Sequence, residues 1–592
     1  MGERHLERLS VRRLEAARVS GVRPLAMGVA FALSAPAQAV VFNIGAVDAQ
    51  LDTSLTVESA WGTAHRDRNL IGARMGGRGL ASTGDAGRLN FKQGEPFTKR
   101  LTGWHGLELK YGDSGVYVSG RYWYDFEQKD ESRRHFDIDD SGRDRLAQAS
   151  GTVLLDAYFY HHYRLQDQPG QIRLGKQVVN WGEGIFFQNG LDIVNPVERS
   201  AYHRPGTLRQ AGALPVNLAY ASQNLTDNLS IDGFYALEWD RSVDENCGTF
   251  FAESDISPQG CNAGLPYNAD GIPVTVPRSG TRNARNGGQW GLASHYYVAP
   301  LDAELGLYVA NYHSRDAMLS GTTATAGAYA GGIATVAAGS RYYSEYPEDI
   351  RLYGLTFSKE TATGTTWRSE LSYRPNAPVA LNGVDLANVA FALDDPSLSR
   401  LRAAPGADLK GYRRLEVTQL QTGVEQTLDN ILGAERLTLL GEVAWVHTAG
   451  LSARGERFGR DPVFGPGPLA DAGCVGLNAA TLGGAGANVA RYCENEGFVT
   501  SNAWGYRIKA VWEYPDLVQR TVFKPNLAWS HDVNGYGPNG SFNEGAKAVS
   551  LGLDAVYQNT YRAAVAYSTF FGGRYNTRVD RDFLSLSIGL DF

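Results

Sequence analysis

Hydrophobic and polar residues alternate with a period of two along many segments of this chain, which is the pattern of β-strands with two different faces. Residues 116–127 form a clear example, in which one face carries Val116, Val118, Tyr122, Tyr124 and Phe126 and the other carries Tyr117, Ser119, Arg121, Asp125 and Glu127. The same alternation recurs from Leu229 and from Leu437. Each segment is about ten residues long, the length that a tilted strand needs to cross a bilayer.

The connections between these segments alternate between short and long. Tight turns are expected at residues 112–115, 166–170, 225–228, 299–302, 361–364, 429–433, 515–519 and 558–559. Longer connections lie near residues 65–97, 129–150, 182–215, 242–287, 315–349, 377–410, 449–501, 533–545 and 573–580. Short turns on one side and long loops on the other are typical of bacterial outer-membrane barrels, with the turns in the periplasm.

These connections predict an all-β fold, a transmembrane antiparallel up-and-down β-barrel of about 18 strands, with 16 as the alternative. An even number brings both chain ends to the periplasmic side. The first strand is expected near residues 51–64, paired with the C-terminal strand, and the barrel is expected to be a monomer or a trimer.

The chain ends in a strand that is apolar at every second residue. Leu584, Leu586, Ile588, Leu590 and Phe592 alternate with small or polar residues, and the last residue is aromatic. Such an ending resembles the signal that the barrel-insertion machinery of Gram-negative bacteria reads. Leu586, Ile588, Leu590 and Phe592 are therefore the expected insertion signal, with this machinery and outer-membrane lipids as partners.

Residues 1–39 have the features of a secretory signal peptide. Six arginines precede an apolar stretch from Leu25 to Leu33, and Ala37-Gln38-Ala39 forms a small-x-small cleavage site. The apolar stretch is too short to span a bilayer as a helix. We therefore expect a cleaved leader, a single barrel domain over residues 40–592, and a location in the outer membrane of a Gram-negative bacterium.

Composition and charge exclude several other classes. The chain contains 69 glycines, 30 tyrosines and 11 tryptophans, and its mean hydropathy of -0.29 argues against a bundle of apolar membrane helices. The formal net charge of -7 argues against nucleic-acid binding. The sequence contains no strong catalytic or metal-binding motif, so we expect no enzyme activity, cofactor or metal.

The four cysteines fall into two local pairs, Cys247 with Cys261 and Cys474 with Cys493, and each pair lies within one long connection. In an exported protein this spacing favours two disulfides on the extracellular side, each closing one loop.

Several motifs resemble a large domain-of-unknown-function family of outer-membrane proteins from pseudomonads and related proteobacteria. They are residues 175–183 (GKQVVNWGE), Asn195-Pro196, residues 204–206 (RPG) and residues 85–91 (DAGRLNF). The family more often has arginine at the position of Lys176. Its members tend to be encoded near a periplasmic lipoprotein-carrier-like protein and a resistance-nodulation-division exporter. The resemblance thus implies traffic of hydrophobic or lipid-like molecules together with these partners.

Within the long connection at residues 182–215, we expect the segment from Trp181 to Gly206 either to fold inward and narrow the lumen or to cap the rim. Trp181 is placed near the outer rim, and Glu183, if it lies inside, needs an arginine partner, for which Arg121 and Arg173 are the candidates. Asn195 and Arg204 complete the expected set of constriction residues.

The first functional hypothesis is an outer-membrane channel for hydrophobic or lipid-like molecules. The alternatives are a selective porin for small hydrophilic solutes and a barrel without transport activity, meaning a surface receptor, an adhesin or an outer-membrane hydrolase.

Overall fold

The computed structural model describes residues 40–592, apart from residues 263, 270–271, 452–454 and 483–488. The expected signal peptide, residues 1–39, lies outside the described residues. Among the helices of the described part, none has the length and apolar character needed to cross a membrane.

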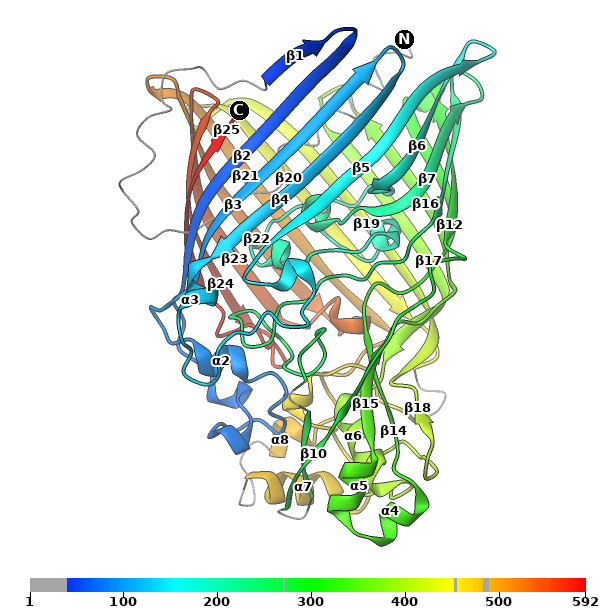
Figure 1. The fold of residues 1–592 in the computed structure, drawn as a ribbon, viewed down its shortest axis with the longest axis vertical. Helices are drawn as coiled ribbons and strands as arrows, with labels where there is room; N and C mark the ends of the chain where they lie inside the picture. Colours follow the sequence, from blue (N-terminus) through cyan, green and yellow to red (C-terminus); the bar gives the residue numbers. More distant parts are fainter. Residues whose placement is uncertain (1–39, 263, 270–271, 452–454, 483–488) are drawn as a thin grey trace.

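The core of the structure is a closed antiparallel barrel of 18 strands, as the alternation of connections predicted (Figure 1). The strands are β2 (Val47–Gly62), β3 (Pro96–Tyr111), β4 (Ser114–Asp125), β5 (Ser150–Leu165), β6 (Gln168–Gln177), β7 (Val216–Asn224), β8 (Leu229–Ala236), β12 (Trp290–Val298), β13 (Ala303–Tyr312), β16 (Ile350–Glu360), β17 (Thr366–Ala380), β19 (Tyr412–Ile431), β20 (Ala434–Thr448), β21 (Asn502–Val518), β22 (Thr521–Asn534), β23 (Ala546–Tyr557), β24 (Tyr561–Gly572) and β25 (Phe583–Asp591).

The barrel closes between its first and last strands. Strand β2 pairs with β3 on one side and with β25 on the other, from Ser54 opposite Asp591 to Gly62 opposite Phe583. The terminal Phe592 extends this seam, because its backbone N–H donates to the carbonyl of Thr53 at 2.9 Å. The expected pairing of the chain's two end strands is therefore correct, although the first strand begins at Val47 rather than Leu51. A short strand, β1 (Val40–Ile44), precedes it and pairs with its start.

All eight expected turns and all nine expected long connections are present between the barrel strands. Figure 1 shows the turns, β1 and the C-terminus at one end of the barrel and the long connections at the other. In the orientation that this arrangement indicates, the long connections form the extracellular end.

The outer surface of the barrel is apolar at alternate positions. Six leucines and isoleucines on different strands keep 49–61% of their surface exposed: Leu174, Leu292, Leu307, Leu355, Leu551 and Ile588. Ala293 and Ser550, the sequence neighbours of Leu292 and Leu551, are buried. Such a surface is stable against lipid tails and costly in water, as expected for a membrane barrel.

One strand ends earlier than the alternation predicted. Strand β4 stops at Asp125, and residues 126–130 form the short helix α3 (Phe126–Asp130). The Asp125 carboxylate explains the change, because it accepts hydrogen bonds from the backbone N–H groups of Glu127 and Gln128 and so caps the helix.

The long connections build an extracellular layer from short elements. Its helices are α2 (Ala86–Asn90), α4 (Ala326–Ala330), α5 (Ile333–Gly339), α6 (Gly383–Ala392), α7 (Gly473–Leu482) and α8 (Val489–Tyr492), and its strands are β9 (Leu265–Ala269), β10 (Ile272–Val276), β11 (Arg278–Arg282), β14 (Met318–Thr322), β15 (Arg341–Glu345) and β18 (Asp408–Leu409).

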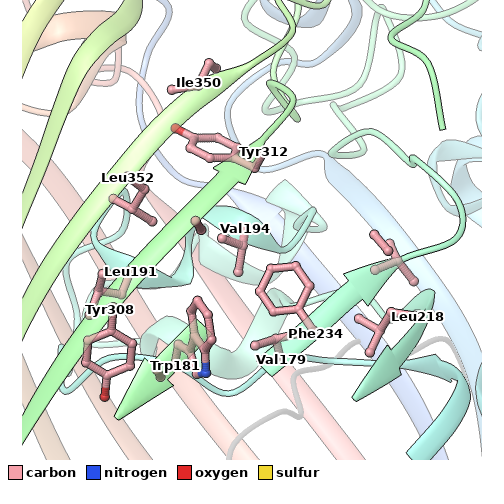
Figure 2. Packing of buried hydrophobic residues seen from close by; sticks show 14 residues of the cluster. Val179, Trp181, Leu191, Val194, Leu218, Phe234, Tyr308, Tyr312, Ile350 and Leu352 are labelled. Atoms are coloured by element: carbon pink, nitrogen blue, oxygen red, sulfur yellow. The ribbon is translucent and has the colours of Figure 1, made fainter. Parts of the chain in front are cut away.

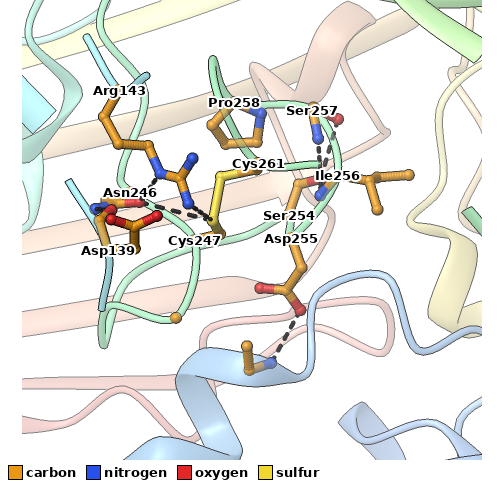
Figure 3. The surroundings of a disulfide bond; sticks show 12 residues. Asp139, Arg143, Asn246, Cys247, Ser254, Asp255, Ile256, Ser257, Pro258 and Cys261 are labelled. Carbon is orange, nitrogen blue, oxygen red and sulfur yellow. Dashed lines mark hydrogen bonds between the residues drawn. A yellow bond between two sulfur atoms is a disulfide. The ribbon is translucent and has the colours of Figure 1, made fainter. Parts of the chain in front are cut away.

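Both cysteine pairs form disulfides in this layer. Cys247 is bonded to Cys261, and Cys474 to Cys493. Around the first of these, Arg143 donates to the side chain of Asn246 at 2.6 Å (Figure 3). By closing loops of 14 and 19 residues, each bond removes conformations from the unfolded chain and stabilises the layer by about 3 kcal/mol.

Thiol labelling tests the two disulfides. We expect no maleimide incorporation into the unfolded, unreduced mature protein, and four labelled cysteines after reduction. Labelling at stoichiometric level without reductant would contradict the pairing.

Two buried carboxyl groups hold neighbouring loops of the layer together. Asp85 accepts a hydrogen bond from the backbone N–H of Gly72 at 2.9 Å, and Asp255 accepts one from Ala86 at 3.0 Å (Figure 3). Burial raises the pKa of Asp85 to about 7 and that of Asp255 to about 6, more than these hydrogen bonds lower them. Both groups thus hold protons in the folded layer at pH values where the unfolded chain has released them.

We expect the extracellular layer to loosen as the pH rises from 5 to 8, because a raised carboxyl pKa gives stability at low pH that is lost towards the folded pKa. Hydrogen exchange at the amides of Gly72 and Ala86, corrected for intrinsic rates, measures the effect. The double variant Asp85→Asn/Asp255→Asn should flatten this pH dependence. Equal protection of the wild-type amides at pH 5 and pH 8 would refute it.

Candidate functional site: a segment folded into the lumen

The connection between β6 and β7 leaves the barrel wall and enters the lumen. We call residues 178–215 the inward segment; it contains the short 3-10 turns η5 (Leu191–Val194), η6 (Arg199–Tyr202) and η7 (Arg209–Gly212). Figure 1 shows it inside the barrel, between the front and back walls. Of the two arrangements considered from the sequence, the structure has the inward one.

One side of the inward segment packs on an apolar part of the inner wall. Val179, Trp181, Leu191 and Val194 of the segment are buried in one cluster with residues of β7, β8, β12, β13 and β16 (Figure 2). The wall residues of this cluster are Val216, Leu218, Phe234, Ala236, Ala293, Tyr308, Ala310, Tyr312, Ile350 and Leu352. Five consecutive strands therefore present apolar side chains to the lumen.

Trp181 lies deep in this cluster and not near the outer rim, where we had expected it. Its ring meets Phe234 and Tyr308 edge to face, with centroids 5.0 and 5.3 Å apart. Its indole Nε1–H donates to the buried carboxylate of Asp232 at 2.8 Å. The expectation failed because β6 ends at Gln177, four residues before Trp181, and the chain then turns inward.

The other side of the inward segment is held by two buried carboxyl groups, one on β17, which pairs with β16, and one on β20. Glu370 on β17 accepts hydrogen bonds from the backbone N–H groups of Glu183 (2.8 Å), Gly184 (3.3 Å) and Leu191 (2.6 Å).

Glu442 on β20 likewise accepts hydrogen bonds from the backbone of Ile185 (2.8 Å), Phe186 (2.6 Å) and Phe187 (2.9 Å). Each of the two side chains thus accepts three hydrogen bonds from the segment's backbone, so they are its main anchors.

Glycines permit the close approach of the segment to Glu370. Gly182 has a φ of +86°, and a Cβ there would lie 2.2 Å from the Glu370 carboxylate. A Cβ at Gly190 would lie 1.9 Å from the same group. Glycine is therefore needed at these positions so that the backbone can approach the carboxylate closely. This requirement gives a physical reason for part of the motif noted in the sequence.

Arg209 fixes the shape of the segment from within. Its buried guanidinium donates to the carbonyls of Trp181 (3.1 Å), Gly182 (3.0 Å) and Gly184 (3.0 Å). It thereby joins the end of the segment to its start and satisfies carbonyls that would otherwise be costly to bury.

Three of the residues selected from the sequence also hold the segment. Asn195 accepts from the backbone N–H of Val179 at 3.0 Å and donates to its carbonyl at 2.7 Å. Arg204 donates to Asn526 on β22 at 2.5 Å and to Ser550 on β23 at 3.1 Å. Arg121 on β4 forms an ion pair with Glu198 of the segment at 2.7 Å.

The arginine partner of Glu183 was predicted wrongly. Glu183 lies 3.8 Å from the Nε of Arg368 on β17, whereas Arg121 pairs with Glu198. Arg173 stacks on Tyr158 and Tyr220, with its guanidinium 5.8 and 4.4 Å from the ring centroids. The reason is that β17 carries the carboxylate that anchors residues 183–191, which brings Glu183 to that wall and away from β4 and β6.

The lumen consequently has two unlike sides. Strands β7 to β16 contribute the apolar cluster, whereas the strands from β17 to β25 contribute buried polar side chains that point inward: Glu370, Gln419, Gln421, Glu442, Asn526, Ser550, Ser568 and Ser585. A second apolar cluster packs on Phe187 of the segment and includes residues of β17 to β21, among them Val379, Val417 and Val446. The inward segment bridges the two sides and fills the space between them.

Sequence reasoning missed the anchoring roles of Glu370, Glu442 and Arg209. Glu370 and Glu442 lie in alternating segments, whose pattern indicates only the face of the strand that each side chain occupies. Their true partners are backbone groups of a segment that lies nearly 180 to 260 positions away in the sequence, and single-strand patterns carry no sign of such contacts.

Replacing Glu442 by Gln should weaken the hydrogen bonds that hold the inward segment against β20. A Gln amide offers one oxygen in place of two and turns an N–H donor towards the segment's own donors. This change destabilises the inward position of the segment by about 2 kcal/mol, which raises the fraction of channels in the open state roughly thirtyfold. Single-channel recording in planar bilayers measures this fraction.

The matched control is Glu108→Gln, because Glu108 accepts from Tyr160 within the wall and holds no part of the segment. Glu183→Gln should change opening less than Glu442→Gln, since the Arg368 contact is long. Identical opening of the Glu442→Gln variant and the wild type would show that Glu442 does not hold the segment.

Comparison with sequence families identifies one that covers nearly the whole chain. The family described as "Protein of unknown function (DUF1302)" matches residues 21–592, and this chain belongs to it. A comparison with curated proteins finds no significant match.

Solved structures with a similar arrangement are bacterial barrels. OccAB1 of Acinetobacter baumannii is 9% identical with a TM-score of 0.40, over 92% of this chain and 96% of that one. OccD3 of Pseudomonas aeruginosa is 10% identical with a TM-score of 0.39, over 94% and 93%. A BenF-like porin from Pseudomonas fluorescens is 8% identical with a TM-score of 0.40, over 92% and 98%.

Proposed function

We propose that this member of the family is an outer-membrane channel for hydrophobic or lipid-like molecules, with the inward segment as its movable closure. The observation that carries the proposal is the apolar inner wall of β7 to β16, which the segment covers in this structure. Water-filled pores are lined by polar groups, and an uncovered apolar wall of this extent favours an apolar or amphiphilic occupant.

The polar side of the lumen supports an amphiphile in particular. A molecule with a polar head and an apolar tail would place its tail on the wall of β7 to β16. Its head would lie near the Ser, Asn and Gln side chains of the opposite strands. Such an arrangement satisfies both parts of the molecule, whereas a purely apolar lumen would penalise the head.

The anchors of the segment support reversible closure. They are hydrogen bonds, two ion pairs and apolar contacts between a loop and the barrel strands, and none of them belongs to the ladder that closes the barrel. The segment is therefore free to leave without breaking the wall. We further propose that transport is coupled to a periplasmic carrier protein and an inner-membrane exporter, and that the protein has no enzyme activity.

A selective porin for small hydrophilic solutes is the second candidate. The inward-pointing groups of the strands from β17 to β25 favour it, among them Lys509, which donates to the carbonyl of Gly206 at 3.1 Å.

Replacing residues 183–209 by a short Gly-Ser linker tests the two candidates. The flanking residues are close enough for such a linker, because the side chains of Asn180 and Gln210 hydrogen-bond at 2.8 Å. We expect the variant to move a fluorescent lysophospholipid from the outer leaflet of proteoliposomes to albumin trapped inside at least about tenfold faster than wild type, since the apolar wall is exposed.

Sugar flux, measured by liposome swelling, is the companion measurement. Faster sugar flux without faster lysophospholipid transfer would favour the hydrophilic porin. No change in either would refute both candidates. Unchanged heat-modifiable electrophoretic mobility would verify that the barrel has folded.

A further inference from the structure

A row of buried polar side chains crosses three neighbouring strands of the inner wall. Glu370 on β17 lies opposite Gln421 on β19. Two residues further along β19, Gly423 lies opposite Glu442 on β20. The side chains of Glu370, Gln421 and Glu442 are buried, with 1–3% of each residue exposed. We call these three residues the polar row.

The inward segment supplies the hydrogen bonds that the two carboxyl groups of the row accept from described residues. Three backbone N–H groups of the segment donate to Glu370, and three donate to Glu442. When the segment leaves, both carboxyl groups lose these donors. A buried acceptor without a donor is costly, so an occupant that brings new donors is favoured over one that does not.

The arginines of the wall that lie nearest to the row in register bind elsewhere. Arg368, two positions before Glu370, pairs with a carboxylate of β19 at 3.3 Å. Arg507 lies opposite Glu442 and pairs with a carboxylate of β22 at 2.6 Å. The donors that replace the segment at the row must therefore come from the molecule that enters the lumen.

Two residues of the segment show how an occupant can satisfy the row and the apolar surfaces together. Leu191 donates its N–H to Glu370, and its side chain is buried in the apolar cluster of β7 to β16 (Figure 2). Phe187 donates to Glu442, and its side chain is buried in the second apolar cluster. The row thus lies within the length of one residue of apolar surface on both sides, as the head group of an amphiphile requires.

Gln421 adds a donor between the two carboxyl groups. Its side-chain nitrogen is buried and has no acceptor among the described residues. A Cβ at Gly184 would lie 2.3 Å from this nitrogen, so the nitrogen faces the segment at close range. An occupant in the position of the segment can therefore offer it an oxygen.

We propose that the polar row is a head-group site, selective for amphiphiles that carry a primary ammonium group close to an acceptor oxygen, as an ethanolamine phospholipid does. This inference rests on the proposed function and adds the head group of the transported molecule. A primary ammonium group brings three N–H donors and a positive charge to the carboxyl groups. A trimethylammonium group has the same charge and no N–H donor.

The linker variant of residues 183–209 tests the site, because it lacks the segment that the row otherwise holds. Transfer to trapped albumin is compared for two lysophospholipids with the same fluorescent chain, one with an ethanolamine head and one with a choline head. At limiting lipid concentration we expect the ethanolamine lipid to move at least about tenfold faster, since only its head donates hydrogen bonds to the row.

Substitutions in the same background locate the source of this preference. The double change Glu370→Gln/Glu442→Gln should remove most of it, because each amide offers fewer acceptor atoms and no charge. The matched control is Glu108→Gln, since Glu108 accepts from Tyr160 within the wall. This control should keep the full preference.

The full-length wild type gives a second measurement that does not depend on folding of the linker variant. The ethanolamine lipid competes with the N–H groups of the segment for Glu370 and Glu442. Added to planar bilayers, it should therefore raise the open fraction in single-channel recordings above that seen with the choline lipid at the same concentration.

The outcomes separate the head-group site from the proposed function. Equal transfer of the two lipids by the linker variant, or equal open fractions of the wild type with either lipid, would overturn the site and leave the lipid channel standing. A preference that survives the Glu370→Gln/Glu442→Gln change would also overturn it, since the row would not be its source. If the linker variant transfers neither lipid, the proposed function fails and the head-group site with it.

Discussion

The structure depends on one constraint, which is that every backbone N–H and C=O group facing lipid needs a hydrogen-bond partner. The barrel meets it by closing β25 on β2, so that the ladder continues around the ring. The same constraint explains why β2 carries partners along both edges.

Inside the barrel, a related constraint holds the inward segment. Loop backbone has no ladder of its own, and its N–H groups still need acceptors when buried. Glu370 and Glu442 provide them from the wall, and the guanidinium of Arg209 satisfies the carbonyls. These three side chains therefore bind mainly the backbone of the loop, and Arg209 in addition pairs with Asp192 at 3.6 Å. Because these contacts lie outside the barrel ladder, the proposed closure can be released without unfolding the barrel.

The strand pattern was predictable because each strand of a membrane barrel faces two different solvents. The lipid and the lumen impose a period of two on every strand, and the turns and loops interrupt it at regular intervals. The number of strands, the turns, the long connections and the joining of the two end strands followed from this local pattern. The local spacing of the cysteines likewise indicated the two pairs that are bonded. The early end of β4 was missed, because the helix cap at Asp125 competes with an alternation that continues past it.

What the sequence by itself determined was therefore the barrel and, through the motif at residues 175–206, the segment on which the functional proposal centres. Only the tertiary structure decided that Trp181 lies against the inner wall and that Glu183 contacts Arg368. It also decided that Glu370 and Glu442 accept hydrogen bonds from the backbone of the segment. The physical reason is that alternation reports which face a residue occupies, whereas these contacts depend on which distant strand stands across the lumen.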